Sequence, residues 1–365
     1  MRVLCFHPSI APYRVDFFNL LSRRCDFSMV FLDKDENCAK YDVEACKARI
    51  TFPFKYLTVG FNFMGRFIRF GIVTAIRDAK PDIVISYEYS WVTLLLSVYR
   101  KLCRSNFKLY TYTDDNPEII SRYGVLRSRL CQFVLTHLDG MIVTGQRTEK
   151  ALRERYNIPA SIRLCRVPII HDEASYRNNA TTVLTMAKEL RRKYDKSSKG
   201  VVLFVGRLVS IKGIDWVINV YAKKSLDLPN LVILGEGELQ REIDEKVSRA
   251  GLDGKIHRIG FQHGIELSAY FAMANCLLLP SRFEPYGAVV PEALLWGTPC
   301  VVSTNVGAQE LIEPGLNGEI IQFGDDEGLR RSIMKWAATA WSTKSLLGVR
   351  LSDCVNDLVR NFAHE

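Results

Sequence analysis

Two glutamates, Glu284 and Glu292, lie eight residues apart in the segment SRFEPYGAVVPEALLWG, which follows an apolar run typical of a buried strand. The segment predicts a turn through Gly287 and then a helix, so both carboxylates are expected to face a ligand at the start of that helix. Backbone N–H groups at a helix start bind phosphate or sugar oxygens. We therefore expect Gly287 and Ala288 to contact the same ligand.

A second loop, Gly206 to Gly213 (GRLVSIKG), follows another apolar run and carries Arg207 and Lys212. A bidentate guanidinium and an ammonium beside a helix start are suited to binding a diphosphate. Taken alone, the two cations are equally well read as a surface arginine and a helix-initiating lysine. A third loop, Gly235 to Glu238, contains a short G-x-G that by itself indicates only a tight turn between strand and helix.

In order and spacing, these three loops resemble the carboxyl-terminal domain of the family-4 retaining glycosyltransferases of the GT-B fold, the group that includes bacterial polysaccharide-type glycosyl transferases group 1. The family's E-x7-E element corresponds to Glu284–Glu292, its G-R-L-x-x-x-K-G loop to Gly206–Gly213, and its G-x-G loop to Gly235–Glu238. Residues 305–310 (NVGAQE) are similar to the family's G-G-x-x-E turn, with Val306 in place of one glycine.

The resemblance implies a role for each matched residue. Arg207 and Lys212 would hold the nucleotide diphosphate, and Glu292 would accept hydrogen bonds from the ribose. Glu284 would contact the donor sugar beside the backbone of residues 286–288. The residues implied to act on the donor are Gly206, Arg207, Lys212, Gly235, Gly237, Glu284, Tyr286, Gly287, Ala288 and Glu292. Fixed cations can stabilise the leaving diphosphate, so no metal and no cofactor are expected.

The first half of the chain resembles the family less closely. Its first loop has Pro12-Tyr13-Arg14 where relatives usually carry a glycine pair. Tyr13 and Arg14 are either acceptor-side contacts or parts of a rigid loop and a helix start. Where many relatives place a histidine facing the sugar, this chain has Asp114, which could bind a sugar hydroxyl. Asp115 either lies on the acceptor side or, like Asn116, caps the next helix.

Short apolar runs alternate with amphipathic segments along the whole chain, which predicts parallel sheets covered by helices. The expected fold class is α/β, as two doubly wound Rossmann-like domains facing a central cleft. The expected boundaries are residues 1–169 for an acceptor-binding domain and 170–199 for a linker with an entry helix. Residues 200–344 would form the nucleotide-sugar domain, and 345–365 a final helix.

The chain has 365 residues, with 49 Lys+Arg against 40 Asp+Glu, which gives a formal charge of +9. Its 48% hydrophobic content is that of an ordinary globular protein. Ten cysteines without a C-x-x-C spacing favour reduced thiols and a cytoplasmic location over a disulfide framework or a structural zinc site. The N-terminus lacks the long apolar core of a secretory signal.

The segment Phe61–Arg77 alternates aromatic residues with Arg66, Arg69 and Arg77 at what we interpret as helical spacing. Such a helix is suited to an anionic membrane surface, which would place the protein on the cytoplasmic face of the membrane. The alternative is a helix that packs in the core and whose arginines are ordinary helix caps. Elsewhere basic and acidic residues are interspersed, and no motif for nucleic-acid recognition appears.

The predicted function is a retaining glycosyltransferase that moves a sugar from a UDP- or GDP-sugar to a saccharide or polyprenyl-linked acceptor, in the biosynthesis of cell-surface glycan or polysaccharide. One alternative is a nucleotide-sugar epimerase of the same fold. Another is a catalytically silent partner subunit that binds nucleotide-sugar, which the aspartate in place of the histidine makes conceivable.

Overall fold

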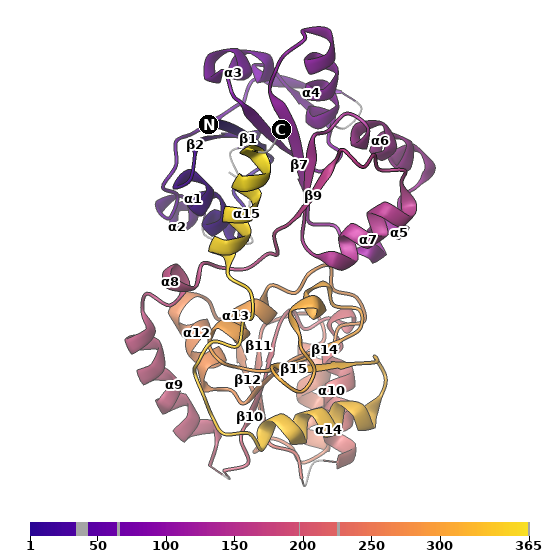
Figure 1. Ribbon diagram of the computed structural model, residues 1–365. Coiled ribbons are helices and arrows are strands. Elements are labelled where there is room, and N and C mark those ends of the chain that lie inside the picture. The colour runs from indigo at the N-terminus through magenta and orange to yellow at the C-terminus, as the bar shows by residue number, and fades with distance from the viewer. Residues whose placement is uncertain (34–42, 64–65, 197, 225–226, 364–365) are drawn as a thin grey trace. The chain divides into compact units, whose positions relative to one another are not determined.

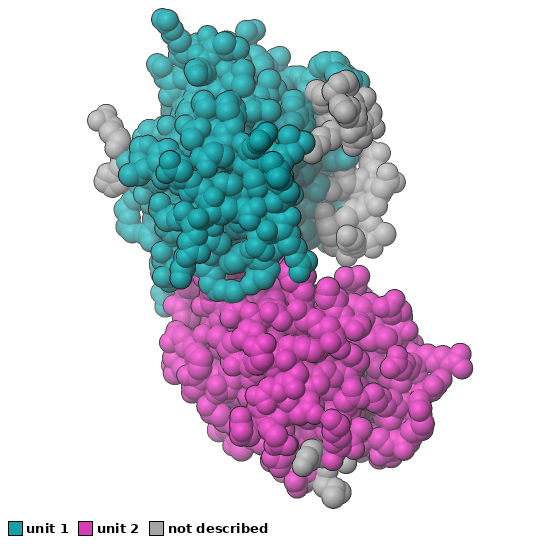
Figure 2. Space-filling view, turned by 90° about the vertical axis from the view of Figure 1, so that its right-hand side faces the viewer, with its two compact units in different colours: residues 1–172, 350–365 teal, residues 173–349 magenta. Residues whose placement is uncertain are grey.

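The computed structural model describes residues 1–33, 43–63, 66–196, 198–224 and 227–363. The chain divides into two compact units, which are coloured separately in Figure 2. Unit 1 contains residues 1–172 together with 350–365, and unit 2 contains residues 173–349. Unit 2 thus begins inside the stretch 170–199 that the sequence analysis assigns to a linker.

Unit 1 is built on a seven-stranded sheet in the order β3-β2-β1-β6-β7-β8-β9, in which every pair is parallel. The strands are β1 (Arg2–His7), β2 (Asp26–Phe31), β3 (Phe54–Tyr56), β6 (Ile83–Tyr87), β7 (Lys108–Thr113), β8 (Gly140–Val143) and β9 (Arg163–Arg166). Central strands such as β1 are nearly continuous in apolar residues because both faces of the sheet are covered.

The helices of unit 1 cover this sheet (Figure 1). They are η1 (Pro12–Arg14), α1 (Val15–Ser22), α2 (Val43–Ala48), α3 (Ile72–Ala79), α4 (Trp91–Leu102), α5 (Pro117–Ser121), α6 (Val125–Leu135) and α7 (Gln146–Arg155). Side chains cap α4 and α5: Ser90 accepts from the Thr93 N–H at the start of α4, and Asn116 accepts from the Ile119 N–H at the start of α5.

Unit 2 has a six-stranded parallel sheet in the order β12-β11-β10-β13-β14-β15. Its strands are β10 (Val201–Val205), β11 (Asn230–Leu234), β12 (Ile256–Gly260), β13 (Cys276–Leu279), β14 (Cys300–Ser303) and β15 (Gly318–Ile321). The strand order reverses between β10 and β13. Ligands of doubly wound sheets bind at such a reversal, beyond the carboxyl ends of the strands.

The helices of unit 2 are α8 (Glu173–Tyr176), α9 (Ala180–Tyr194), η2 (Ser210–Lys212), α10 (Ile214–Lys224), α11 (Gln240–Arg249), α12 (Gly264–Met273), α13 (Val289–Leu295), η3 (Gly307–Leu311) and α14 (Asp326–Ala337). Helix α9 packs against α12 and buries Val183 and Ala187 in the core of this unit. Both units are Rossmann-like, so the predicted α/β fold class is confirmed.

The final helix, α15 (Leu351–Ala363), returns to unit 1 and packs on α1 and β9 (Figure 1). Its buried residues Leu351, Val355, Leu358 and Phe362 form one apolar stripe, spaced as a helix requires. The Asn361 carbonyl accepts hydrogen bonds from Tyr110 Oη at 3.3 Å and from Arg163 at 2.6 Å. The helix is therefore part of the core of unit 1, although in the sequence unit 2 lies between α15 and the rest of unit 1.

The prediction of one long helix across residues 61–77 is wrong. Strands β4 (Gly60–Phe63) and β5 (Arg66–Arg69) pair as an antiparallel hairpin, and only α3, from Ile72, is helical. Phe61 and Phe63 alternate with Asn62, which is the two-residue period of a strand. Gly71, at φ +93°, then changes the chain direction before α3.

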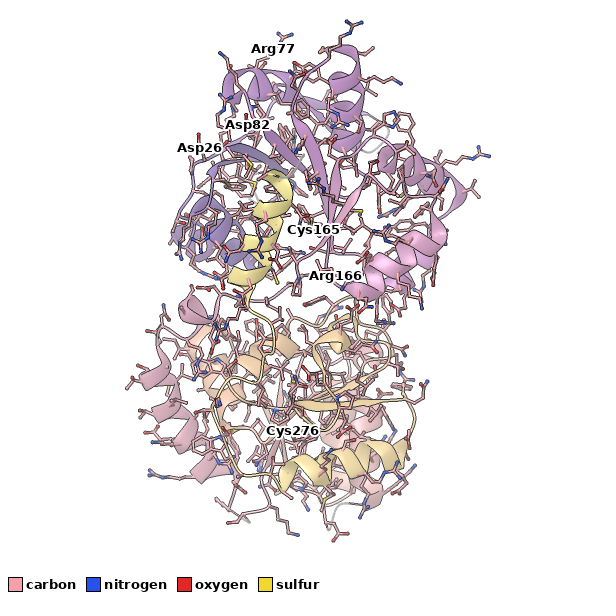
Figure 3. All side chains as sticks on the ribbon, viewed as in Figure 1. Asp26, Arg77, Asp82, Cys165, Arg166 and Cys276 are labelled. Carbon is pink, nitrogen blue, oxygen red and sulfur yellow. The ribbon has the colours of Figure 1, made fainter. Side chains whose placement is uncertain are left out.

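The membrane prediction rested on one basic helix across residues 61–77, and the structure has a hairpin and a shorter helix there instead. The Arg69 guanidinium donates to the Leu32 carbonyl and lies 3.5 Å from Asp33, while Arg77 is exposed on α3 (Figure 3). Membrane association itself stays a prediction. Of the helices in the described part of the chain, none combines the length and the apolar composition needed to cross a bilayer.

The cysteines of the described residues carry free thiols, most of them inside the two cores. Cys165 on β9 and Cys276 on β13 are examples (Figure 3). Burial raises the pKa of both thiols, that of Cys165 to about 11, so neither has thiolate character at neutral pH.

Candidate active site

Four loops meet at the carboxyl edge of the unit 2 sheet, around the reversal of strand order. They are residues 206–213 after β10, 235–238 after β11, 280–288 after β13 and 304–307 after β14. These strands are neighbours in the order β11-β10-β13-β14, so the loops that follow them lie side by side. The three motifs found in the sequence therefore belong to one place in the fold.

The centre of this loop cluster is an ion pair between Lys212 and Glu284. The Lys212 side chain is 18% exposed and that of Glu284 is 11% exposed, so water screens the pair only partly. The backbone of Glu284 is fixed from both sides: its N–H donates to the Asn305 carbonyl at 3.0 Å, and its carbonyl accepts from the Gly307 N–H at 3.1 Å. The carboxylate and the ammonium thus hold each other in a rigid setting.

Lys212 is positioned by the turn that contains it. It ends the 3₁₀ turn η2, and Gly213 follows in the left-handed region at φ +73°. A Cβ at Gly213 would lie 2.2 Å from the Pro280 carbonyl oxygen, so a larger residue cannot occupy this position without moving the β13 loop. The glycine lets the lysine loop pack directly against the loop that carries Glu284.

The other predicted donor-side residues flank this pair. Arg207 is exposed in the first residues after β10, and Glu292 is half-buried in the first turn of α13. Tyr286 and Ala288 lie in the β13 loop, where the Tyr286 carbonyl accepts from the Ala308 N–H at 2.7 Å. Their roles toward a donor stay predictions.

The G-x-G loop has a packing reason for its glycines. A Cβ on Gly235 would lie 2.0 Å from the Gly206 carbonyl oxygen, and one on Gly237 would lie 2.4 Å from the Leu208 carbonyl oxygen. The Gly206 N–H in turn donates to the Leu234 carbonyl at 3.0 Å. The loops after β10 and β11 therefore pack backbone against backbone.

In unit 1 the sheet also reverses, between β1 and β6, and polar side chains collect at the carboxyl ends of its central strands. Arg14, after β1, is 1% exposed and donates to Asp114 at the end of β7. Its guanidinium also lies 5.6 Å from the ring centre of Tyr112 and 5.7 Å from that of Phe17. The sequence analysis considered Arg14 and Asp114 separately as possible substrate contacts, and the structure pairs them with each other.

Tyr13 and His7 border this ion pair. Burial and the Asp114 carboxylate raise the pKa of Tyr13 to about 12. His7 stacks on Tyr112 with ring centres 5.5 Å apart, and its Nδ1 accepts from the Ser9 N–H at 3.3 Å. Burial lowers the pKa of His7 to about 4, so its imidazole is neutral at pH 7.

Asp115 does not cap the helix that follows it, because Asn116 does so. Its carboxylate instead accepts from Tyr123 Oη and from Arg127, the latter at 3.1 Å. The Arg127 guanidinium lies 4.0 Å from the Tyr123 ring centre. These contacts fix Asp115 to α6 and its preceding loop.

Glu88, directly after β6, is a functional candidate that the sequence analysis missed. It has a left-handed backbone at φ +44° and lies 3.6 Å from Arg127. Burial, together with the Asp115 carboxylate, raises the pKa of Glu88 to about 7. The available signal was its position at the carboxyl end of a central strand, beside the reversal of strand order.

The buried His7 predicts a pH-dependent stability for unit 1. Its pKa is about 4 when folded and about 6.5 when unfolded, so the unfolded state binds more protons between these values. The free energy of unfolding should therefore fall as pH drops from 6.5 to 4, by at most about 3 kcal/mol. In His7→Gln this contribution is absent, and its stability should fall less than that of the wild type over that window.

Hydrogen exchange of unit 1 peptides at several pH values measures this difference, with His137→Gln in the same unit as the control. Glu88 contributes the opposite slope, because its pKa is raised on folding, but it is common to all the proteins and cancels. Parallel pH profiles for His7→Gln and the wild type would contradict the prediction.

Among the described residues, no group of His, Cys, Asp or Glu side chains is arranged to hold a metal ion. The residues matched to the family in and beside this loop cluster offer a ligand the cations Arg207 and Lys212, the carboxylates Glu284 and Glu292, and loop backbone. That set suits an anionic, hydroxyl-rich molecule such as a nucleotide.

Residues 186–343, within unit 2, match the family model described as Glycosyl transferases group 1. Over 120 residues the chain is 37% identical to an uncharacterized glycosyltransferase of Methanocaldococcus jannaschii, covering 32% of this chain and 30% of that protein. Over 135 residues it is 31% identical to the lipopolysaccharide core biosynthesis glycosyltransferase LpsE of Rhizobium meliloti, covering 36% and 38%. The chain matches about a third of the length of these curated relatives.

Solved structures resemble the chain along its whole length. HepE of Anabaena, in complex with UDP, covers 100% of both chains with a TM-score of 0.73 and 16% identity. Sucrose-phosphate synthase of Thermosynechococcus elongatus covers 98% of this chain and 94% of its own, with a TM-score of 0.67 and 18% identity. The chain therefore has the fold of the GT-B glycosyltransferases, and its second unit contains the part that matches Glycosyl transferases group 1.

Proposed function

We propose that this protein is a retaining glycosyltransferase that transfers a sugar from a nucleotide-sugar donor to a saccharide or lipid-linked acceptor in glycan biosynthesis. The observation that carries the proposal is the Lys212–Glu284 ion pair at the strand-order reversal of unit 2, with Arg207 and Glu292 on adjoining elements. The match of residues 186–343 to a glycosyltransferase family supports it.

The chemistry of sugar transfer explains these groups. When the bond between the anomeric carbon and the donor phosphate breaks, negative charge grows on the leaving diphosphate. Arg207 and Lys212 would stabilise that charge from fixed positions, which needs no reorganisation during the reaction. Glu284, held by Lys212, would accept hydrogen bonds from hydroxyls of the donor sugar, and Glu292 from those of the ribose.

Retention of the anomeric configuration is part of the proposal. The E-x7-E spacing of Glu284 and Glu292 supports it, because that element is a mark of the retaining family that the sequence resembles. The acceptor hydroxyl would attack from the face that the diphosphate leaves, and an oxygen of the departing phosphate would take its proton. In this scheme Glu284 binds the sugar and does not form a covalent intermediate.

The donor is proposed to be a UDP- or GDP-sugar. HepE, which has the same fold, was solved with UDP and with UDP-glucose, which makes uridine nucleotides the first to test. The proposed acceptor is a saccharide, free or linked to a lipid.

Thermal unfolding with UDP, GDP, ADP and their sugars tests the proposal. A nucleotide present at one hundred times its Kd should stabilise the folded protein by about 2.7 kcal/mol and raise the Tm by several degrees. Lys223→Gln, a change on the exposed face of α10, should respond like the wild type. If no nucleotide shifts the Tm, the proposed function is wrong. If a nucleotide-sugar does bind, NMR of the anomeric proton in the transfer product distinguishes retention from inversion.

A further inference from the structure

Unit 1 contains a pocket of about 770 Å³ that none of the assigned motifs uses. It opens between the end of β6, helix α4 and helix α6. Residues in its lining include Glu88, Tyr89, Trp91, Leu126, Arg127 and Leu130. The lining thus combines aromatic and aliphatic surface with one carboxylate and one guanidinium, a composition typical of small-molecule sites.

The backbone of Glu88 is held in an unusual conformation at the edge of this pocket. Its φ of +44° is uncommon for a residue with a side chain. Its N–H donates to the Tyr112 carbonyl at 2.7 Å, and its carbonyl accepts from Thr93 Oγ1 at 3.0 Å and Thr111 Oγ1 at 2.8 Å. Strained residues that their surroundings hold so firmly occur preferentially at functional sites.

The charges around the pocket indicate what it would accept. Arg127 is shared by Glu88 at 3.6 Å and Asp115 at 3.1 Å, and Asp114 is paired with the buried Arg14. Glu88 and Arg127 line the pocket, and counting the neighbouring Asp115, Asp114 and Arg14, three carboxylates share two guanidinium groups. An additional anion would be repelled, whereas a neutral ligand with hydroxyl groups would find oxygen acceptors.

We propose that this pocket binds a neutral sugar ring of the acceptor, with the Glu88 carboxylate accepting hydrogen bonds from ring hydroxyls and Trp91 lining the apolar wall. Arg127 orients the carboxylate. The inference deepens the proposed glycosyltransferase function and rests on it, since it says which sugar chemistry the acceptor presents. It also assigns a specificity-determining role to Glu88.

Protonation of Glu88 provides an independent readout. Burial and the Asp115 and Asp114 carboxylates at the end of β7 together raise its pKa to about 7, against the opposing effect of Arg127 on α6. Tyr13, before α1, also faces it, and Tyr123 is bonded to Asp115. A hydroxyl donates best to the ionised carboxylate, so sugar affinity should rise about tenfold between pH 6 and pH 8, as Glu88 loses its proton.

The test uses the full chain and methyl α-glucoside, methyl α-galactoside and methyl α-mannoside at millimolar concentrations, with binding followed by saturation-transfer NMR. At least one glycoside should bind the wild type. Glu88→Gln should weaken its affinity about tenfold and remove the pH dependence. Glu154→Gln, an exposed change on α7, is the matched control and should behave like the wild type.

If Glu88→Gln misfolds, a second variant, Trp91→Leu, still tests the inference, because it alters the apolar wall of the pocket without changing a charged residue. It should also weaken glycoside binding while the pH dependence persists. Equal affinities for wild type, Glu88→Gln and Trp91→Leu, or no glycoside bound to the wild type, would overturn the inference. Nucleotide binding in the same samples separates the two proposals, since its absence refutes the glycosyltransferase function itself.

Discussion

Replacing Lys212 with methionine should reduce nucleotide-sugar turnover by about a hundred- to a thousandfold, which is the cost of removing one preorganised charge-stabilising group. Methionine keeps much of the volume of the lysine stem but removes the ammonium that pairs with Glu284. Release of nucleoside diphosphate measures turnover, and calorimetry with UDP or GDP measures binding. Nucleotide affinity should fall as well, because the diphosphate loses a cation.

The same change should destabilise unit 2, since it leaves the largely buried Glu284 carboxylate without its ammonium. Breaking a buried ion pair in this way costs about 3–5 kcal/mol. The double variant Lys212→Met/Glu284→Gln also removes the negative charge that the ammonium had balanced, so it should recover most of the stability while turnover stays low. Near-wild-type turnover in this stable double variant would contradict the assigned role of Lys212.

Replacing Arg14 with methionine should lower the free energy of unfolding of unit 1 by about 3 kcal/mol. The Arg14 side chain is 2% exposed, and its loss leaves Asp114 without its paired cation. It also removes the contacts of the guanidinium with the rings of Phe17 and Tyr112. Hydrogen exchange resolved by peptide is the appropriate measurement, because a chain of two units need not unfold in one step.

Arg153→Met in the same unit is the matched control. Its ion pair with Glu149 lies within one exposed helix face, so its loss should cost less than about 1 kcal/mol. Adding Asp114→Asn to Arg14→Met should restore part of the lost stability by removing the unpaired charge. If Arg14→Met costs no more than Arg153→Met, the pair does not stabilise the first unit.

Much of the sheet architecture could be predicted because each strand is determined by its own short stretch of sequence. The runs Lys108–Thr113, Gly140–Val143 and Cys300–Ser303 form the strands β7, β8 and β14. Each is a short apolar or β-branched run, and a parallel strand buried on both faces needs no other signal. The donor-side loops were found for a similar reason, since each follows its strand directly.

The β4–β5 hairpin could not be read correctly from the spacing of its arginines. Residues 61–77 contain both a strand period and a helix period, and Gly71 marks the point at which one gives way to the other. The error came from treating the segment as one element. A glycine within an apparent helical pattern is a reason to consider a break.

The polar cluster of unit 1 could not be predicted, because it consists of pairs of residues that are far apart in the sequence. Arg14 and Asp114 are 100 residues apart, and nothing local indicates that one neutralises the other. Glu88 and Arg127 come together only when β6 and α6 are placed in the fold. Single residues at strand ends could be identified as candidates, but their partners could not.

The return of α15 to unit 1 has a consequence for the order in which the protein is made. The apolar surface that Leu358 and Phe362 cover stays open while residues 173–349 are synthesised, because α15 is made after them. Unit 2 has all its residues before unit 1 does, although unit 1 starts first. On the ribosome, the amino-terminal unit would therefore be the last to complete its core, and during that interval it is the part most in need of a chaperone.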